Sequence, residues 1–291
     1  MAQKKSTKPS VIPLLKTSID ILLGNKLILL PFCIIAFVQL LILEILYFVP
    51  RYPLSVFFAP IIRRVWSERF LHYPFNFILL PKLFQYTQTA TYLFLSSFLI
   101  GVAIYIIFLI NNEKKVSFRI AFQETVSSYI HIFLGALFSL LTYYGLASLY
   151  GLVIGRAFKI RSETGIFYII KRVVTDSAPY GHLLIGILVT TVFAFVIPII
   201  VIEKRKFFSA ITINFKNLWR SFWYIFALAF IPTLLYVPVL LLRNNISNLE
   251  DTVVPGIRVL VLILNIFIVI AIDATVYTAI TTYYLLQKEN K

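Results

Sequence analysis

The sequence predicts an all-α polytopic membrane protein with about six transmembrane helices and several interfacial amphipathic helices. Hydrophobic residues make up 60% of the 291 residues and charged residues only 13%, whereas a soluble domain usually has about 25% charged residues. The mean hydropathy is +0.89. Because a soluble fold could not cover so much apolar surface, lipid must solvate much of this chain.

Six apolar windows support this fold class. Each is close to the roughly 20 residues that an α-helix needs to cross the hydrocarbon core, and none alternates polar and apolar residues as a transmembrane β-strand does. Together they hold two acidic residues, Glu44 and Asp273, and no lysine or arginine. The first window is too long for a cleavable signal peptide. The windows cover residues 27–48, 90–110, 132–154, 183–202, 222–242 and 259–282.

An amphipathic segment precedes each pair of windows, and we expect all three segments to lie in the membrane interface. In the third of them, Ile211, Phe215 and Leu218 form an apolar stripe, while Asn214 and Lys216 fall mostly on the opposite, polar side. The three segments cover residues 10–26, 115–130 and 206–221.

This recurring order suggests three degenerate copies of one helical-hairpin unit. Two junctions between units are similar, because Glu113-Lys114-Lys115 and Glu203-Lys204-Arg205-Lys206 each follow a window and precede an amphipathic segment. The alternative is that the junctions of any polytopic protein look alike. The predicted organisation is a basic tail, 1–9, and one transmembrane domain, 10–291, with repeat units 10–112, 113–202 and 203–287.

The net charge of +15 predicts contact with anionic lipid head groups rather than with nucleic acid, because the basic residues are spread over every loop. Basic clusters at the N-terminus and after the fourth window place both termini in the cytoplasm. The expected location is a cell membrane, such as the bacterial inner membrane. Segments 54–65 and 166–173 are also amphipathic and fall on the other face.

Asp273 is the main candidate for a functional residue, and Asn265 adds polarity to the same window. A carboxylate inside a spanning helix costs roughly 2.5–3.5 kcal/mol on insertion scales, so it should face the bundle interior. One hypothesis makes Asp273 a proton- or ion-coupled site. The favoured alternative is a structural clamp that is hydrogen-bonded to another helix, because the windows offer no second buried charge as a relay partner.

The sequence gives no indication of catalysis, a cofactor or a metal site. Cys33 is the single cysteine, and His72, His131 and His182 stand alone, not at metal-ligand spacing. No phosphate-binding loop, nucleophile elbow, zinc motif or dinucleotide fingerprint occurs. We therefore expect a protein that is not an enzyme.

The third window carries a ridge of small residues at multiples of four, which lets another helix approach closely. We expect this ridge to pack inside the bundle rather than to form a dimer. Its members are Gly135, Ser139, Ala147, Gly151 and Gly155.

The region after the fourth window resembles a known family. Residues 196–204 read VIPIIVIEK, residues 208–210 read FSA and residues 217–223 read NLWRSFW. This pattern is similar to a bacterial polytopic membrane-domain family that includes uncharacterised stand-alone proteins and the membrane domain fused to some glycerophosphodiester phosphodiesterases. The resemblance implies a spanning helix ending in Pro and Glu, a basic turn, an amphipathic helix and another span. The phosphodiesterase domain is absent from this sequence, so that activity does not transfer.

Three functions compete on the sequence alone. The first is a non-catalytic module, an accessory or scaffold protein that interacts with lipids or a membrane-protein partner. The second is a transporter or permease with a polar site near Asp273, supported by Pro232 and Pro238 in the fifth window. The third, a lipid-modifying enzyme, requires a cluster of acidic residues or histidines that we do not find. We favour the non-catalytic module.

Overall fold

The computed structural model describes residues 10–65, 67–158, 164–245 and 256–289, and this part of the chain is helical with no strand. The all-α prediction is therefore confirmed. The predicted tail, 1–9, lies outside the described residues. The elements are α1 (Val11–Gly24), α2 (Lys26–Phe48), α3 (Leu54–Val65), η1 (Glu68–Leu71), α4 (Phe75–Thr91), η2 (Tyr92–Ser96), α5 (Ser97–Asn111), α6 (Phe118–Val126), α7 (Tyr129–Phe158), α8 (Gly165–Asp176), α9 (Ala178–Val192), α10 (Val196–Glu203), α11 (Phe207–Leu218), α12 (Phe222–Thr233), η3 (Leu234–Tyr236), α13 (Val237–Asn244) and α15 (Ile257–Glu289).

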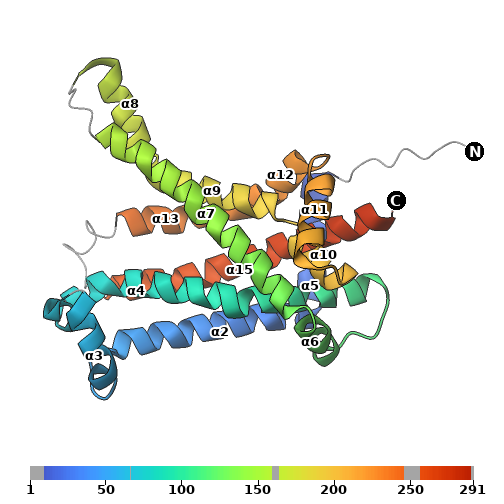
Figure 1. The fold of residues 1–291 in the computed structure, drawn as a ribbon, viewed down its shortest axis with the longest axis horizontal. Helices are drawn as coiled ribbons and strands as arrows, with labels where there is room; N and C mark the ends of the chain where they lie inside the picture. The colour runs from blue at the N-terminus through green and yellow to red at the C-terminus, as the bar shows by residue number, and fades with distance from the viewer. Residues whose placement is uncertain (1–9, 66, 159–163, 246–255, 290–291) are drawn as a thin grey trace, which may run out of the picture.

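Six helical segments of the described chain are long and apolar enough to cross a membrane, as the six windows predict. They run along the long axis of the molecule (Figure 1). We call the end at which α1 lies and α15 finishes the terminal end, and the opposite end the distal end. The spans are Lys26–Phe48, Phe75–Asn111, Tyr129–Ala157, Ala178–Glu203, Phe222–Asn244 and Ile257–Glu289.

The second span is longer than the sequence predicts, because it begins at Phe75 rather than at residue 90. Its first part, α4, contains Gln85, Gln88 and Thr89, which lower the local hydropathy and make the segment look like a loop. These polar side chains line a cavity within the bundle. The Gln88 amide, for example, donates a hydrogen bond to the Gln39 side-chain oxygen of α2 at 3.3 Å.

The spans form a closed ring in which each contacts the next. The order of contact is α2, α5, α7, α9, α12, α15 and back to α2. Helix α5, the terminal half of the second span, also packs across the ring against α10 and α15. The terminal half of the bundle is therefore filled at its centre.

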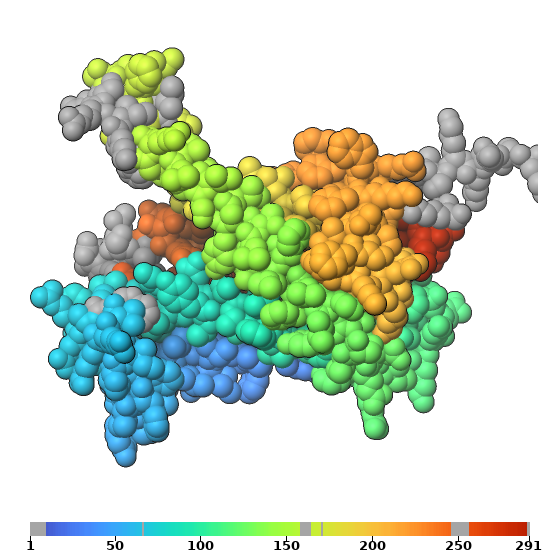
Figure 2. Space-filling model, in the orientation of Figure 1, coloured from blue at the N-terminus to red at the C-terminus, as the bar shows by residue number. Residues whose placement is uncertain are grey.

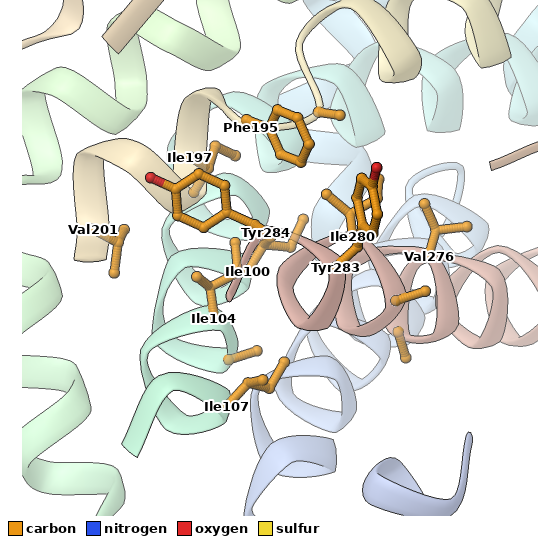
Figure 3. Packing of buried hydrophobic residues seen from close by; sticks show 14 of the residues in the cluster. Ile100, Ile104, Ile107, Phe195, Ile197, Val201, Val276, Ile280, Tyr283 and Tyr284 are labelled. Atoms are coloured by element: carbon orange, nitrogen blue, oxygen red, sulfur yellow. The ribbon is translucent and has the colours of Figure 1, made fainter. Parts of the chain in front are cut away.

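Aliphatic and aromatic side chains make this terminal half dense. Figure 3 shows Phe195, Ile197 and Tyr284 close together, with Ile100 and Ile104 of α5 nearby. The ring centroids of Phe195 and Tyr284 lie 5.4 Å apart. Phe195, Ile100 and Ile104 are at most 1% exposed. Because branched side chains interdigitate closely, this core leaves little space for water.

The predicted amphipathic segments form helices at both ends of the bundle. Helices α1, α6 and α11 lie at the terminal end, and α3 and α8 lie at the distal end, where α8 and the adjoining end of α7 project away from the bundle (Figures 1 and 2). In α11, Leu218 is buried as expected, but Phe215 is 46% exposed. The assignment of Asn214 to the polar side is wrong, since this residue is fully buried.

The ends of the first two predicted repeat units share a backbone feature. Glu113, two residues after the end of the second span, has a φ of 52°, and Lys204, the residue after the end of the fourth span, has a φ of 54°. Both are left-handed conformations that non-glycine residues adopt uncommonly. The common geometry supports the repeat hypothesis, which stays a prediction.

The ridge of small residues on α7 divides into two parts. A Cβ added at Gly135 would meet Val196 of α10 at 3.2 Å, whereas a Cβ at Gly151 or Gly155 would meet nothing within 4 Å. The expected internal packing therefore holds at the terminal end of the ridge, and the glycines at its distal end face no described residue closely.

Glycine substitutions test the contrast between the two halves. A Cβ at Gly101 would meet Thr125, Ile132 and Val201 at 3.0–3.3 Å. We expect Gly101→Ala to destabilise the protein by about 1–3 kcal/mol, as overpacking of a dense core does. The measurement is thermal unfolding in detergent. Gly151→Ala is the matched control and should leave the melting temperature unchanged or slightly raised, and equal effects of the two variants would contradict the packing described.

Candidate functional site

Three spans of the described chain are interrupted close to their midpoints. The second span contains a π-helical segment, η2, and the fifth contains the 3₁₀ segment η3 directly after Thr233, near Pro232. In the fourth span, residues 193–195 form turns between α9 and α10. Such irregularities free backbone groups from the helical ladder and often mark functional sites in spanning helices.

The turns in the fourth span expose backbone groups that the membrane cannot hydrate, and the side chain of Asn214 satisfies two of them. Its oxygen accepts a hydrogen bond from the Phe195 N–H at 3.0 Å, and its nitrogen donates one to the Val192 carbonyl at 2.7 Å. An unsatisfied backbone group in hydrocarbon costs several kcal/mol. Asn214 therefore holds the break in place and ties it to α11.

The interruptions surround a cavity in the centre of the bundle. It has two adjoining lobes with volumes of about 560 and 510 Å³. Side chains from all six spans line the lobes. The residues that line both are Tyr92, Tyr236, Arg243, Val269 and Asp273.

Both residues that the sequence singles out lie on this cavity. Asp273 lines both lobes, and Asn265 lines the larger one, two turns away on the same face of α15. Asp273 occupies the middle residue of α15, which spans Ile257–Glu289. The cavity thus extends from the distal end of the bundle, where Arg258 lines it, to the middle of α15.

The carboxylate of Asp273 forms no hydrogen bond and no ion pair with any residue that the structure describes. It interacts electrostatically with the hydroxyl groups of Tyr92 and Tyr277. The clamp hypothesis requires a hydrogen bond from Asp273 to another helix, and the described residues do not supply one. The carboxylate instead faces the cavity.

A small chamber of about 30 Å³ lies beside Tyr92 on the terminal side. Ser139, Ala194 and Tyr277 are among its lining residues. The Tyr92 hydroxyl interacts with the side chains of Ser139 and Tyr277, so these groups separate the chamber from the main cavity. A chamber of this volume is large enough for a water molecule, and it borders the turns that Asn214 holds.

Two arginines mark the distal part of the cavity. Arg243 is exposed near the end of α13, and Arg258 lies near the start of α15. The Arg258 guanidinium donates a hydrogen bond to the Phe77 carbonyl at 3.4 Å, which holds it against the wall formed by α4. Among described residues that line the lobes, Asp273 is the one acidic group.

Sequence reasoning missed most of the polar residues around Asp273. Gln39, Gln88, Tyr143 and Tyr236 line the cavity, but uncharged polar side chains and tyrosines also occur at membrane interfaces, so composition does not single them out. His182 lines the smaller lobe, and it belongs to no group of three or more acidic, histidine or cysteine side chains among the described residues that could hold a metal. The sequence feature that could have identified Gln39 and Gln88 is the occurrence of glutamines within or next to apolar windows.

Comparison with protein-family models, curated proteins and solved structures finds no match to this chain. The resemblance to the bacterial membrane-domain family therefore stays a prediction. What is said of the site rests on its own geometry.

Substitution of Asn214 tests the two hydrogen bonds that its side chain makes with the turns in the fourth span. We expect Asn214→Leu to lower the stability by about 1–3 kcal/mol, because it leaves a buried donor and a buried acceptor unsatisfied. Thermal unfolding in detergent measures the loss. Thr212→Ala, at an exposed position of the same helix, is the control and should change stability by less than about 0.5 kcal/mol. A neutral Asn214→Leu variant would show that the break is held by other contacts.

Proposed function

We propose that this multi-pass membrane protein is a transporter that binds a small polar solute beside Asp273. One observation carries the proposal: a cavity reaches from the distal end of the bundle to a carboxylate at the middle of α15 that has no ion-pair partner among the described residues. An ionisable side chain at that depth is costly and usually marks a substrate or ion pathway. The lobes also fall within the 300–1,000 Å³ of small-molecule sites.

The interrupted helices support movement around this site. Transporters commonly bind their substrates near the bilayer midplane between discontinuous helices, and one group of helices then rocks against another. Here η2, the turns at 193–195 and η3 all border the cavity or the small chamber. These points give the second, fourth and fifth spans places to bend.

A set of polar contacts closes the terminal end. The Tyr284 hydroxyl donates to Glu203 at 2.6 Å, and Lys288 lies 3.5 Å from the same carboxylate. Lys204 pairs with Glu124 of α6 at 2.9 Å. Opening of the cavity towards the terminal end requires these contacts and the core beneath them to separate, so we propose that they form the closed gate.

A non-catalytic scaffold or accessory role is the second candidate. It is supported by the amphipathic helices α3 and α8, which carry exposed apolar side chains such as Phe57 and Ile169 beside basic residues. In both proposals the basic residues contact anionic head groups and the termini lie in the cytoplasm of a bacterial cell. Neither proposal is enzymatic, because Asp273 has no acid, base or nucleophile hydrogen-bonded to it among the described residues.

Accessibility from both sides of the membrane distinguishes the two candidates. Val269 lines both lobes one turn from Asp273. In a Cys33→Ser background, we expect a cysteine at Val269→Cys to react with a membrane-impermeant thiol reagent from the distal side. We also expect slower reaction from the terminal side, because a transporter exposes its site to each side in turn. The measurement is the modification rate in vesicles of each orientation.

Four control variants allow the modification rates to be interpreted. Ser67→Cys and Lys16→Cys replace exposed residues at the distal and terminal ends and report the sidedness of the vesicles. Leu264→Cys and Phe267→Cys lie on the exposed apolar face of α15 and should be unreactive in lipid. Reaction of Val269→Cys from the distal side alone would favour a static module over a transporter.

A further inference from the structure

We infer that the cavity binds a small organic cation, a protonated or quaternary amine, with its positive group against Asp273. The inference rests on the proposed function and names its class of substrate. It depends on three observations: the unpaired carboxylate, the tyrosines around it and the position of the arginines.

The charge of Asp273 is not balanced by an ion pair with any residue that the structure describes. None of the described lysines or arginines forms an ion pair with it, and the basic groups that line the lobes with it are Arg243, Arg258 and His182. A carboxylate in a space of low dielectric attracts a cation much more strongly than it does in bulk water. A bound cation would compensate for its desolvation.

Tyrosine side chains favour an organic cation over a metal ion. Tyr92 and Tyr236 line both lobes together with Asp273, and Tyr143 lines one of them. Aromatic rings attract ammonium groups, and the attraction grows when water is excluded. A calcium ion takes six to eight oxygen ligands, whereas the described residues contain no group of three or more acidic, histidine or cysteine side chains that could hold a metal.

Arg258 lies too far from Asp273 to cancel its field. Arg258 and Asp273 are 15 residues apart on α15, which is about 22 Å along a helix. The coulombic interaction falls with distance, so Arg258 acts on Asp273 much more weakly than a cation in contact with the carboxylate does. Arg243 lies seven residues beyond Tyr236, near the distal end. A compact anion would be attracted by the guanidinium groups at the distal end of the cavity but repelled by the carboxylate of Asp273 at its inner end.

The glutamines and Asn265 provide uncharged hydrogen-bonding groups distal to the carboxylate. Gln39 and Gln88 already pair with each other and line the larger lobe. Its volume of about 560 Å³ accommodates a molecule larger than an ammonium ion. The predicted ligand therefore combines one positive group with an uncharged polar or apolar part.

Reagents of opposite charge test the inference on the full chain. At Val269→Cys in the Cys33→Ser background, the modification rate is measured with trimethylammonioethyl methanethiosulfonate, a cation, and with sulfonatoethyl methanethiosulfonate, an anion. The ratio of the two rates is divided by the same ratio for 2-mercaptoethanol in solution. We expect a normalised ratio of about ten, because the thiol lies one helical turn, about 6 Å, from the carboxylate. Asp273→Asn should bring the ratio close to one, and Asp20→Asn, at an exposed position of α1, should leave it unchanged.

Protection from labelling provides an independent readout. Choline should slow modification of Val269→Cys, and 3,3-dimethyl-1-butanol, its neutral isostere, should not; Asp273→Asn should remove the protection. A normalised ratio of one or below, or equal protection by choline and its isostere, overturns the cation assignment while labelling from both sides still supports a transporter. Failure of both reagents to reach Val269→Cys, with the cysteine at Ser67→Cys fully labelled, overturns the proposed function as well.

Discussion

The central site depends on the two hydrogen bonds that the side-chain amide of Asn214 makes with the turns of the fourth span. A break in a spanning helix is tolerated only where other groups replace the lost backbone hydrogen bonds. Asn214 supplies one acceptor and one donor at the turns of the fourth span, and those turns border the small chamber beside Tyr92. Because the amide comes from α11, a helix at the terminal end, the break at the centre of the membrane is mechanically tied to an interfacial helix.

The two halves of the bundle differ in the chemistry of their side chains. The terminal half brings α5, α10 and α15 together through residues such as Ile100 and Ile199, which are almost completely buried. The distal half contains the glutamines of α4 and the cavity. The same six helices therefore form a close-packed core on one side of Asp273 and a cavity on the other.

Hydropathy predicted the six spans because a run of about 20 apolar residues has few alternative explanations. It missed the start of the second span, because Gln85 and Gln88 lower the hydropathy there. In the structure both line a cavity that they share with helices distant in the sequence. Helical periodicity likewise placed Asn214 on the polar side, because it describes one helix and contains nothing about a break in another. Asp273 was identifiable because a carboxylate in an apolar window is rare, but its tyrosine neighbours were not.

The length of helix α15 affects how the protein fits bilayers of different thickness. Its 33 residues give a length of about 50 Å, well beyond the roughly 30 Å hydrocarbon core of a typical bilayer. The helix must therefore tilt, or extend its ends into the head groups. Because Asp273 occupies its middle, a change in tilt leaves the carboxylate near the same depth but moves the two ends of the helix, including Arg258 at the distal end of the cavity, relative to the head groups. Bilayer thickness thus acts on the two ends of α15, and so on the distal part of the cavity, through hydrophobic mismatch.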